Sequence, residues 1–396
     1  MRILLVHNEY KEYGGEDVAV SSEESILLAQ GHDVRKVIFA NASVSPGPLG
    51  LIQYVFSLPF NLRSARRISR EIASFRPDVM HVHNLFYVAS PSVIIRASKL
   101  GIPVVMTLHN YRIICSGGLL IRSGKICERC IKSRFPFSGV LHRCHQNSLF
   151  GSFYLTLSMG FHKSMSTWKN HVSLFITMTE FIKQKFIHSS MGVPPENFVI
   201  KANSVTDQGM GPPEGRSNRF LFVGRLTTEK GVELLSTAFK KNSYELDVIG
   251  DGPKRLAVQE LCRQNCRVNY LGFLSRDEIS NRLKNAKALI VPSLWYEGLP
   301  TTILEAFSTG TPIIVSDIGN LNEIVTHGFN GLCFDPKRVD SLNETLDVIL
   351  QNPEIHASLC KNARLTYLQK YTPEINGRNL EKIYLMAKAK KGIKVK

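Results

Sequence analysis

The sequence predicts an α/β protein made of two Rossmann-like domains, each built on a parallel sheet, that face each other across a cleft. Short apolar runs alternate with helical patterns along nearly the whole chain, which is typical of βαβ units. A polar, Gly- and Pro-rich stretch without an apolar period, residues 206–219, interrupts this pattern near the middle. Each half then opens on a strand followed by a glycine turn, so we expect the two halves to have similar folds.

Length and composition agree with two soluble domains. The chain has 396 residues, of which 43% are hydrophobic, and this is too long for one ordinary core. The segment Met1–His7 is a short strand rather than a signal peptide, and we therefore expect a cytoplasmic protein. The formal net charge of +16 predicts an anionic partner. We do not expect nucleic acid to be that partner, because no motif with base-reading residues is present.

The strands and domain limits follow from this pattern. We expect a first domain over residues 1–205 with a cysteine-rich insert at about 112–147, a linker over 206–219, and a second domain over 220–372. The remaining residues, 373–396, should form a helix and a basic tail that packs back on the first domain. The expected strands include Ile3–Val6, Val79–Val82, Val104–Leu108, Leu174–Met178, Phe220–Val223, Leu246–Ile249, Ala288–Val291 and Ile313–Val315.

Both halves of the chain contain residues suited to binding a phosphate group. Gly14 and Gly15 precede a helical pattern that runs to about residue 30, and free N–H groups at a helix start attract anions. In the second half, Gly224 and Arg225 follow a strand, and Lys230 lies in the same loop. A planar guanidinium and a mobile ammonium suit a diphosphate. The alternative is that both are surface charges, with Lys230 paired to a neighbouring glutamate.

Two carboxylates and a second glycine turn follow in the second half. Glu297 lies in a loop at the carboxyl end of a strand, and Glu305 lies in the helix that follows. A carboxylate accepts two hydroxyl hydrogen bonds at once, which suits a ribose or hexose diol. Gly250 and Gly252 form a tight turn after another strand and are expected beside the donor. The alternative is that these residues are solvated glutamates and an ordinary turn.

Together these segments resemble family 4 of the retaining glycosyltransferases, which has the GT-B fold. The resemblance spans nearly the whole chain in the family's order. One departure is the turn after the linker strand, where Asn203-Ser-Val-Thr-Asp207 replaces the usual Asn-Gly-Val-Asp. The matching segments are Gly14-Gly15, Thr107–Tyr111, Lys201–Ser204, Gly224–Gly231, Gly250–Pro253, Leu271–Phe273, Pro292-Ser293, Glu297 with Glu305, and Gly328–Leu332.

The resemblance implies transfer of a sugar from a nucleotide donor, a UDP- or GDP-sugar, with retained anomeric configuration and without a catalytic metal. It implies that Arg225 and Lys230 neutralise the leaving diphosphate, that Glu305 binds the ribose, and that Glu297 holds hydroxyls of the donor sugar. The expected acceptor is lipid-linked or a polysaccharide in cell-surface glycan synthesis. Two alternatives remain open: a nucleotide-sugar epimerase of the same fold, and a non-catalytic subunit that binds a nucleotide sugar.

Three histidines end strands in the first half. The resemblance places His109 beside the donor sugar and its phosphate, whereas the alternative is a structural histidine that bonds a carbonyl. His81 and His83 also end a strand. We expect their side chains to point to opposite faces of the strand, and we therefore expect packing or acceptor-side roles for them rather than a shared metal.

Four cysteines lie within thirty residues of one another, at Cys115, Cys127, Cys130 and Cys144. The Cys127–Cys130 spacing is typical of metal ligands, and the other two could complete a four-thiolate structural zinc site. Free thiols or a disulfide are the alternatives. No other cofactor is expected.

The stretch Val37–Leu62 contains no charged residue, and its prolines exclude a membrane-spanning helix. Four arginines follow at helical spacing, at Arg63, Arg66, Arg67 and Arg70. An apolar loop beside a basic stripe favours contact with an anionic lipid surface, and the protein is then peripheral at the inner face of the membrane. The alternative is a buried loop and the solvated face of an ordinary helix.

Overall fold

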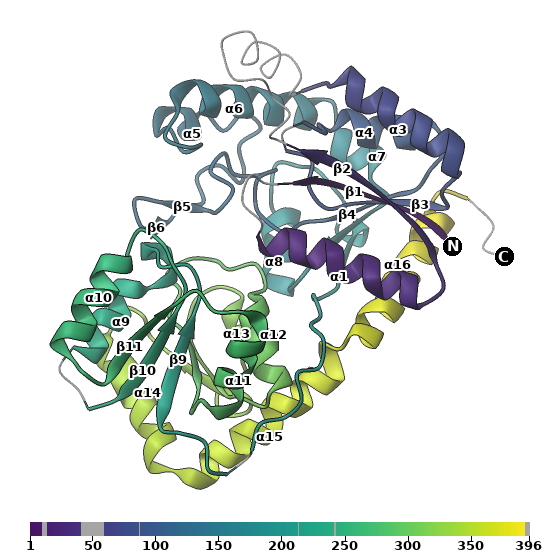
Figure 1. Cartoon of the computed structure of the whole chain (residues 1–396). Coiled ribbons are helices and arrows are strands. Elements are labelled where there is room, and N and C mark those ends of the chain that lie inside the picture. The colour runs from purple at the N-terminus through teal and green to yellow at the C-terminus, as the bar shows by residue number, and fades with distance from the viewer. Residues whose placement is uncertain (10–13, 41–58, 87, 213, 241–242, 393–396) are drawn as a thin grey trace. The chain divides into compact units, whose positions relative to one another are not determined.

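A computed structural model describes residues 1–9, 14–40, 59–86, 88–212, 214–240 and 243–392 (Figure 1). Backbone contacts divide the chain into two compact units. The first comprises Met1–Leu120, Cys127–Asn203 and Glu374–Lys396, and the second comprises Ile121–Ile126 and Ser204–Pro373.

The first unit is built on a six-stranded parallel sheet of order β2-β1-β3-β4-β7-β8. The strands are β1 Arg2–Glu9, β2 Asp33–Ala40, β3 Val79–Val82, β4 Val104–Thr107, β7 Leu174–Thr177 and β8 Phe198–Ile200. The helices are α1 Gly15–Ala29, α3 Leu62–Phe75, α4 Ser92–Lys99, α5 Phe137–Leu141, α6 Leu149–Ser164, α7 Thr167–His171, α8 Glu180–Ile187, α16 Pro373–Lys390 and the 3-10 turn η2 Pro195–Asn197.

The second unit repeats this architecture, with a six-stranded parallel sheet of order β11-β10-β9-β12-β13-β14. Its strands are β9 Arg219–Val223, β10 Glu245–Ile249, β11 Val268–Gly272, β12 Leu289–Val291, β13 Ile313–Ser316 and β14 Gly331–Phe334. Its helices are α9 Val232–Phe239, α10 Arg255–Gln264, α11 Arg276–Asn285, α12 Thr301–Ser308, α13 Leu321–Ile324, α14 Val339–Gln351, α15 Pro353–Lys370 and the 3-10 turn η3 Thr228–Lys230. A short hairpin, β5 Ile121–Arg122 with β6 Lys125–Ile126, pairs antiparallel.

The predicted pair of parallel-sheet domains is confirmed, and each of the eight predicted runs lies in or over a strand. The strands of the two six-stranded sheets outside that prediction, β2, β8, β11 and β14, are the four edge strands of these sheets. A central parallel strand is buried on both faces and therefore has a continuous apolar sequence, whereas an edge strand tolerates polar residues. Strand β2 shows this clearly, because only Val37 and Phe39 of its eight residues are buried.

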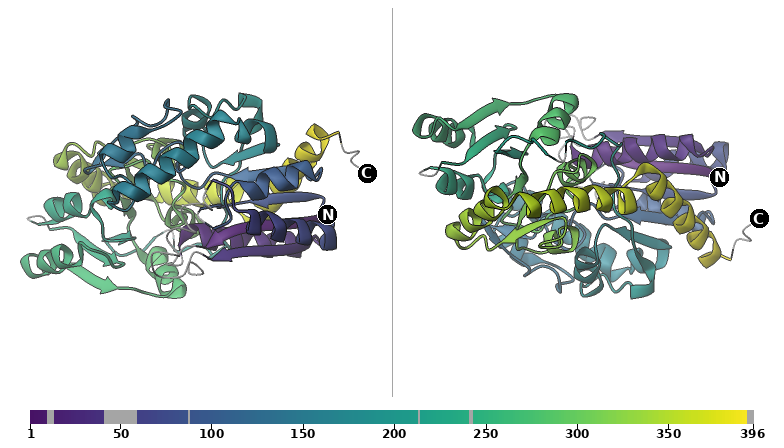
Figure 2. Two further views of the ribbon diagram at one scale, coloured as in Figure 1. Left: turned by 90° about the horizontal axis from the view of Figure 1, so that it is seen from above. Right: turned by 90° about the horizontal axis from the view of Figure 1, so that it is seen from below.

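The C-terminal helix α16, yellow in both views of Figure 2, packs on the sheet of the first unit. Leu380, Ile383 and Tyr384 join a buried cluster with Ile3 and Val79 of β1 and β3. Chain segments from the two ends of the sequence thus share one core. Of the predicted apolar stretch Val37–Leu62, residues 41–58 lie outside the described part of the chain.

Candidate active site

The second sheet has a point at which its strand order reverses. The chain runs through β9, β10 and β11 to one side and then through β12, β13 and β14 to the other, so the reversal lies between β9 and β12. Ligands of open α/β sheets bind at such a point, outside the carboxyl ends of the strands. Lys230 ends the 3-10 turn after β9, and Glu297 lies in the loop between β12 and α12.

Lys230 and Glu297 form an ion pair at this reversal. The Lys230 ammonium donates to both carboxylate oxygens of Glu297, at 2.7 and 2.9 Å, and the Ser293 hydroxyl donates to one of them. Glu297 is only 4% exposed. Burial alone would raise the pKa of Glu297, but the charge of Lys230 and these hydrogen bonds lower it below its ordinary value. The carboxylate is therefore held ionised and in a fixed orientation.

The Lys230 ammonium is bonded to Glu297 rather than to the neighbouring Glu233. Glu233 instead accepts from Lys254 at 2.6 Å and from the Thr228 hydroxyl at 2.9 Å. The Lys230 ammonium also lies over the Trp295 ring, 5.5 Å from its centroid. An aromatic face attracts a cation and so helps to fix the position of this ammonium.

The two other charged candidates of the second unit, Arg225 and Glu305, lie on segments that follow the same two strands. Arg225 is exposed on the loop directly after β9. Glu305 is half-buried in the second turn of α12, the helix that follows β12. Burial raises the pKa of Glu305, and Arg276 opposes this shift. Lys230 and Glu297 are thus in direct contact, while Arg225 and Glu305 lie on the elements that extend from the same two strands.

The predicted donor-side glycines of the second unit, Gly224, Gly250 and Gly252, allow close backbone packing. Gly250 and Gly252 have φ values of 132° and 154°, and a Cβ at Gly250 would lie 1.9 Å from the carbonyl oxygen of Gly224. A Cβ at Gly252 would lie 2.6 Å from the Leu226 carbonyl oxygen. The amides of Gly224 and Gly250 donate to backbone carbonyls at 3.0 and 2.8 Å. These residues therefore let the loops after β9 and β10 pack closely, and their amides are already used within the protein.

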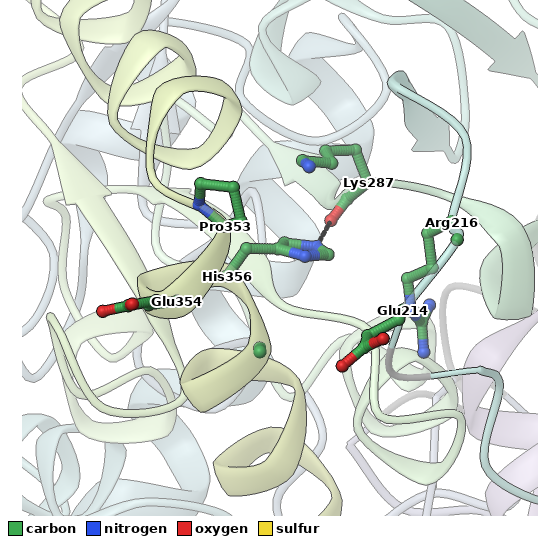
Figure 3. A pocket seen from close by; sticks show the side chains of 8 residues that line it. Glu214, Arg216, Lys287, Pro353, Glu354 and His356 are labelled. Carbon is green, nitrogen blue, oxygen red and sulfur yellow. Dashed lines mark hydrogen bonds between the residues drawn. The ribbon is translucent and has the colours of Figure 1, made fainter.

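A cavity of about 390 Å³ lies at the opposite, amino-terminal edge of the same sheet (Figure 3). His356 Nε2 donates to the Lys287 carbonyl at 2.8 Å, and the buried Arg216 guanidinium donates to carbonyls at the ends of α11 and α12. A cation is favourable at helix C-termini. The Arg216 guanidinium and the His356 ring are thus bonded within the protein, and Arg216 attaches the predicted linker, residues 206–219, to the rest of the second unit.

In the first unit, the glycine turn after β1 begins helix α1. The Gly14 N–H donates to Asp17 Oδ2 at 2.8 Å, and His7 Nε2 lies 2.8 Å from Asp17 Oδ1. A Cβ built on Gly15 meets nothing within 4 Å. The Gly14 amide is therefore engaged by Asp17, whereas the surface beside Gly15 is open to a ligand.

Histidines gather at the point where the order of the first sheet reverses, between β1 and β3. The ring centroids of His81 and His83 are 4.2 Å apart, so the expectation that they point to opposite faces is wrong. Residues two apart along a strand line the same face, and His83, one residue beyond the end of β3 at Val82, keeps that alternation. His83 Nδ1 is hydrogen-bonded to His109 Nε2 at 3.0 Å. Burial lowers the pKa of His109, and nearby carboxylates oppose this shift.

Glu23 of α1, which the sequence analysis did not identify as a site residue, lies close to the rings of His81 and His83. Its Oε2 atom is 3.7 Å from His81 Nδ1 and 3.6 Å from His83 Nε2. Within the described residues this trio is the one group of three potential ligand atoms close enough to hold a metal ion. However, the buried Lys201 ammonium donates to Glu23 Oε1 at 2.6 Å and already supplies a cation. A second buried cation beside it is unfavourable, so we interpret the group as a buried ion-pair network.

The cysteine cluster is only partly assembled. The thiols of Cys115 and Cys130 are hydrogen-bonded and buried, and backbone N–H groups donate to the Cys115 sulfur. Cys127 and Cys144 are half-buried. In the described chain no three of the four sulfurs form a group with metal-binding distances. Binding of zinc by all four would require Cys127 and Cys144 to move towards the Cys115–Cys130 pair.

Comparison with known proteins agrees with the fold. A curated relative, the uncharacterized glycosyltransferase MJ1607 of Methanocaldococcus jannaschii, is 33% identical over 174 residues, which are 42% of this chain and 44% of the relative. A galactosyltransferase of Escherichia coli, named for UDP-Gal and a GlcNAc-diphosphoundecaprenol acceptor, is 33% identical over 160 residues, 38% of this chain and 41% of the relative. The chain thus spans less than half the length of these two relatives.

Solved structures match nearly the whole chain. HepE of Anabaena in complex with UDP aligns with a TM-score of 0.66 and 16% identity over 97% of this chain and 99% of its own. Sucrose-phosphate synthase of Thermosynechococcus elongatus aligns with a TM-score of 0.68 and 17% identity over 98% and 99%. The model of Glycosyltransferase Family 4 matches residues 26–207, and that of Glycosyl transferases group 1 matches residues 209–366. The chain therefore belongs to the family 4, group 1 glycosyltransferases with the GT-B fold.

Proposed function

We propose that this protein is a retaining glycosyltransferase that moves a sugar from a nucleotide-sugar donor to a lipid-linked or polysaccharide acceptor in cell-surface glycan synthesis. The observation that carries this proposal is the Lys230–Glu297 pair at the strand reversal of the second unit. An ammonium held by a buried, ionised carboxylate at a ligand-binding edge is suited to a substrate that has both negative charge and hydroxyl groups.

In the proposed donor complex, Lys230 and Arg225 bind the diphosphate. Glu305 accepts hydrogen bonds from the ribose hydroxyls, and Glu297 accepts them from the sugar. Glu305 suits this role because its half-buried carboxylate, near the start of α12, can accept two hydroxyl hydrogen bonds at once. On the first unit, the Gly15 amide and His109 are assigned to the sugar and its phosphate. HepE was solved with UDP, and a UDP-sugar is therefore the first donor class to test.

The reaction breaks the bond between the anomeric carbon and the diphosphate oxygen and forms a bond from an acceptor hydroxyl oxygen to the same carbon. The hydroxyl proton passes to the departing diphosphate. Because negative charge grows on the leaving oxygen, fixed cations beside it stabilise the transition state. Lys230 and Arg225 supply that charge from the protein itself, which fits a reaction without a catalytic metal.

The acceptor proposal rests on relatives and on charge. The Escherichia coli relative and a Campylobacter jejuni relative, 29% identical over 41% of this chain and 43% of its own, are both named for undecaprenol-linked acceptors. The basic face of α3 in the first unit suits an anionic membrane surface. We therefore propose a cytoplasmic enzyme that works at the inner face of a membrane.

The test is to incubate the purified protein with UDP- and GDP-sugars and with undecaprenyl-diphosphate-linked acceptors, and to identify products by mass spectrometry and NMR. We expect one donor to give a glycosylated lipid with the anomeric configuration of the donor. Release of an isomerised sugar without acceptor would instead identify an epimerase. Tight nucleotide-sugar binding without any turnover would identify a non-catalytic subunit.

A further inference from the structure

Helix α6, Leu149–Ser164 in the first unit, buries several polar side chains and exposes large apolar ones. Its buried residues include Ser152, Thr156, Ser158, His162 and Lys163. Except for the terminal Ser164, its exposed residues are large and apolar, and we call these the outer face of α6: Leu149, Phe150, Phe153, Leu157 and Phe161. A surface helix of a soluble protein normally shows the opposite arrangement.

The inward polar side chains are held by specific bonds. The Ser116 and Thr156 hydroxyls are 3.2 Å apart, and the buried Lys163 ammonium donates to the Ser133 carbonyl at 3.0 Å. A Cβ at Gly160 would lie 2.0 Å from the Phe135 ring, so this ring packs directly on the helix backbone. The helix cannot rotate to bury its aromatic residues without breaking these contacts, and its outward apolar face is therefore fixed.

The outer face is continuous. Phe150, Phe153, Leu157 and Phe161 follow one another at spacings of three and four residues, which places them along one side of a helix. Phe150 is 79% exposed. The short helix α5, which packs against α6, adds Leu141 at 77% exposure (Figure 1). Contiguous exposed apolar surface of this kind marks a site of interaction.

Two segments of the sequence, one that contains α6 and one that leads into α3, carry basic but no acidic residues. No Asp or Glu occurs between Arg129 and Thr179, and none occurs between Val34 and Arg70. The exposed basic residues in the first of these segments include Lys132, Arg134, Arg143 and Lys169. A basic, carboxylate-free region around an aromatic ridge is complementary to anionic lipid headgroups over an apolar interior.

The C-terminal end of α6 also joins the segment that begins the basic helix α3. His162 Nε2 donates to the Pro59 carbonyl at 2.7 Å, and the Phe60 ring stacks on His162 with centroids 6.5 Å apart. Phe60 and Leu62 are themselves exposed. The apolar outer face thus continues towards the arginines of α3 within one unit.

We propose that the outer face of α6 is a membrane-docking surface, which inserts its Phe and Leu side chains into the interface of an anionic lipid bilayer while the surrounding basic residues contact the headgroups. This inference rests on the proposed function, because a lipid-linked acceptor would then reach the first unit from the same surface. The helix lies in the interface and does not cross the bilayer: of the described helices, none is both long and apolar enough to do so.

The test is flotation of the purified protein with vesicles of phosphatidylcholine mixed with phosphatidylglycerol. We expect the wild type to float and Phe150→Ser/Phe153→Ser to lose roughly tenfold or more in vesicle affinity, since two apolar anchors are removed. Phe150→Leu/Phe153→Leu should retain most of the affinity. The matched control is Leu256→Ser/Phe273→Ser, which alters two apolar residues of the second unit that are at least as exposed as Phe153, and it should float like the wild type.

Circular dichroism verifies that each variant is folded. Equal flotation of the wild type and the α6 serine variant, or no flotation of the wild type, would overturn the proposal. A wild-type dimer that the α6 substitutions dissociate, without an effect on vesicle binding, would show that the face joins two copies of the chain instead. Donor turnover in solution should be unchanged in the serine variant, so a failure of the docking surface and a failure of the transferase function give different results.

Discussion

Lys230 and Glu297 are 67 residues apart in the sequence, and the Lys230 ammonium lies 2.7 and 2.9 Å from the two carboxylate oxygens of Glu297. Parallel β-strands explain this convergence, because β9 and β12 are neighbours and both end at the same edge of the sheet. The pair keeps a cation in place before any donor binds. Such preorganisation lowers the cost of stabilising charge in the transition state.

Glu305→Ala should chiefly weaken donor binding. A contact to the ribose is made equally in the ground state and in the transition state, so its loss raises KM and leaves kcat nearly unchanged. Calorimetry of nucleotide binding provides the direct measurement, with the exposed Glu344→Ala as control. Unchanged nucleotide affinity of Glu305→Ala would remove the ribose assignment.

Glu23→Gln should destabilise the first unit at neutral pH by about 3–5 kcal/mol, because it leaves the buried Lys201 ammonium without its charge partner. Burial would raise the pKa of Glu23, but Lys201 and His83 lower it below its ordinary value. The pair therefore stabilises the fold above the ordinary Glu pKa, and this contribution is lost as the pH falls through the lowered value.

Urea unfolding of wild type and Glu23→Gln over a range of pH measures this difference. We expect the gap between the two proteins to shrink below a pH of about 4. Glu23→Gln/Lys201→Met, which removes both charges, should regain part of the stability. A gap that does not depend on pH would contradict the ion-pair interpretation.

If the four cysteines bind structural zinc, the protein purified without added metal should contain about one zinc ion per chain. Cys127→Ser should then lose the metal and lower the thermal stability of the first unit. Cys266→Ser, an exposed cysteine of the second unit, is the control. Absence of zinc and iron in elemental analysis would leave the Cys115–Cys130 contact as a pair of packed thiols.

Replacing Arg63, Arg66, Arg67 and Arg70 of α3 with alanine should weaken binding to acidic vesicles by orders of magnitude, at roughly 1 kcal/mol per basic residue. All four are exposed, although Arg67 also donates to the Ile38 carbonyl at 2.8 Å. High salt should reproduce the effect in the wild type, because it screens the same charges. Flotation that is insensitive both to salt and to these substitutions would show that α3 does not contact lipid.

The fold was predictable because central parallel strands are continuous apolar runs and the glycine turns mark where helices begin. The positions of Lys230 and Glu297 after the ends of strands were predictable for the same reason, but their direct contact was not predicted. The contact between His81 and His83 was predictable too, because residues two apart on a strand share a face, and the expectation of opposite faces misapplied this alternation. Glu23 and Lys201 are 178 residues apart, and no local pattern connects them.

The inverted polarity of α6 was also invisible in the sequence. Its apolar residues have a helical period that predicts a buried face, and only the tertiary contacts of Thr156, His162 and Lys163 reveal that the polar side faces inward. The hydrophobic period of a helix identifies its two faces, but it does not show which of them packs against the core.

The central claim is that Lys230 and Arg225 neutralise the leaving diphosphate of a nucleotide sugar. The most direct measurement is kcat of Lys230→Ala with the donor found in the screen, beside Lys240→Ala, an exposed lysine after α9. The account predicts a loss in kcat of about 10²–10³-fold for Lys230→Ala, since a group that stabilises transition-state charge is removed, and none for Lys240→Ala. A near-normal kcat in folded Lys230→Ala protein would contradict the account.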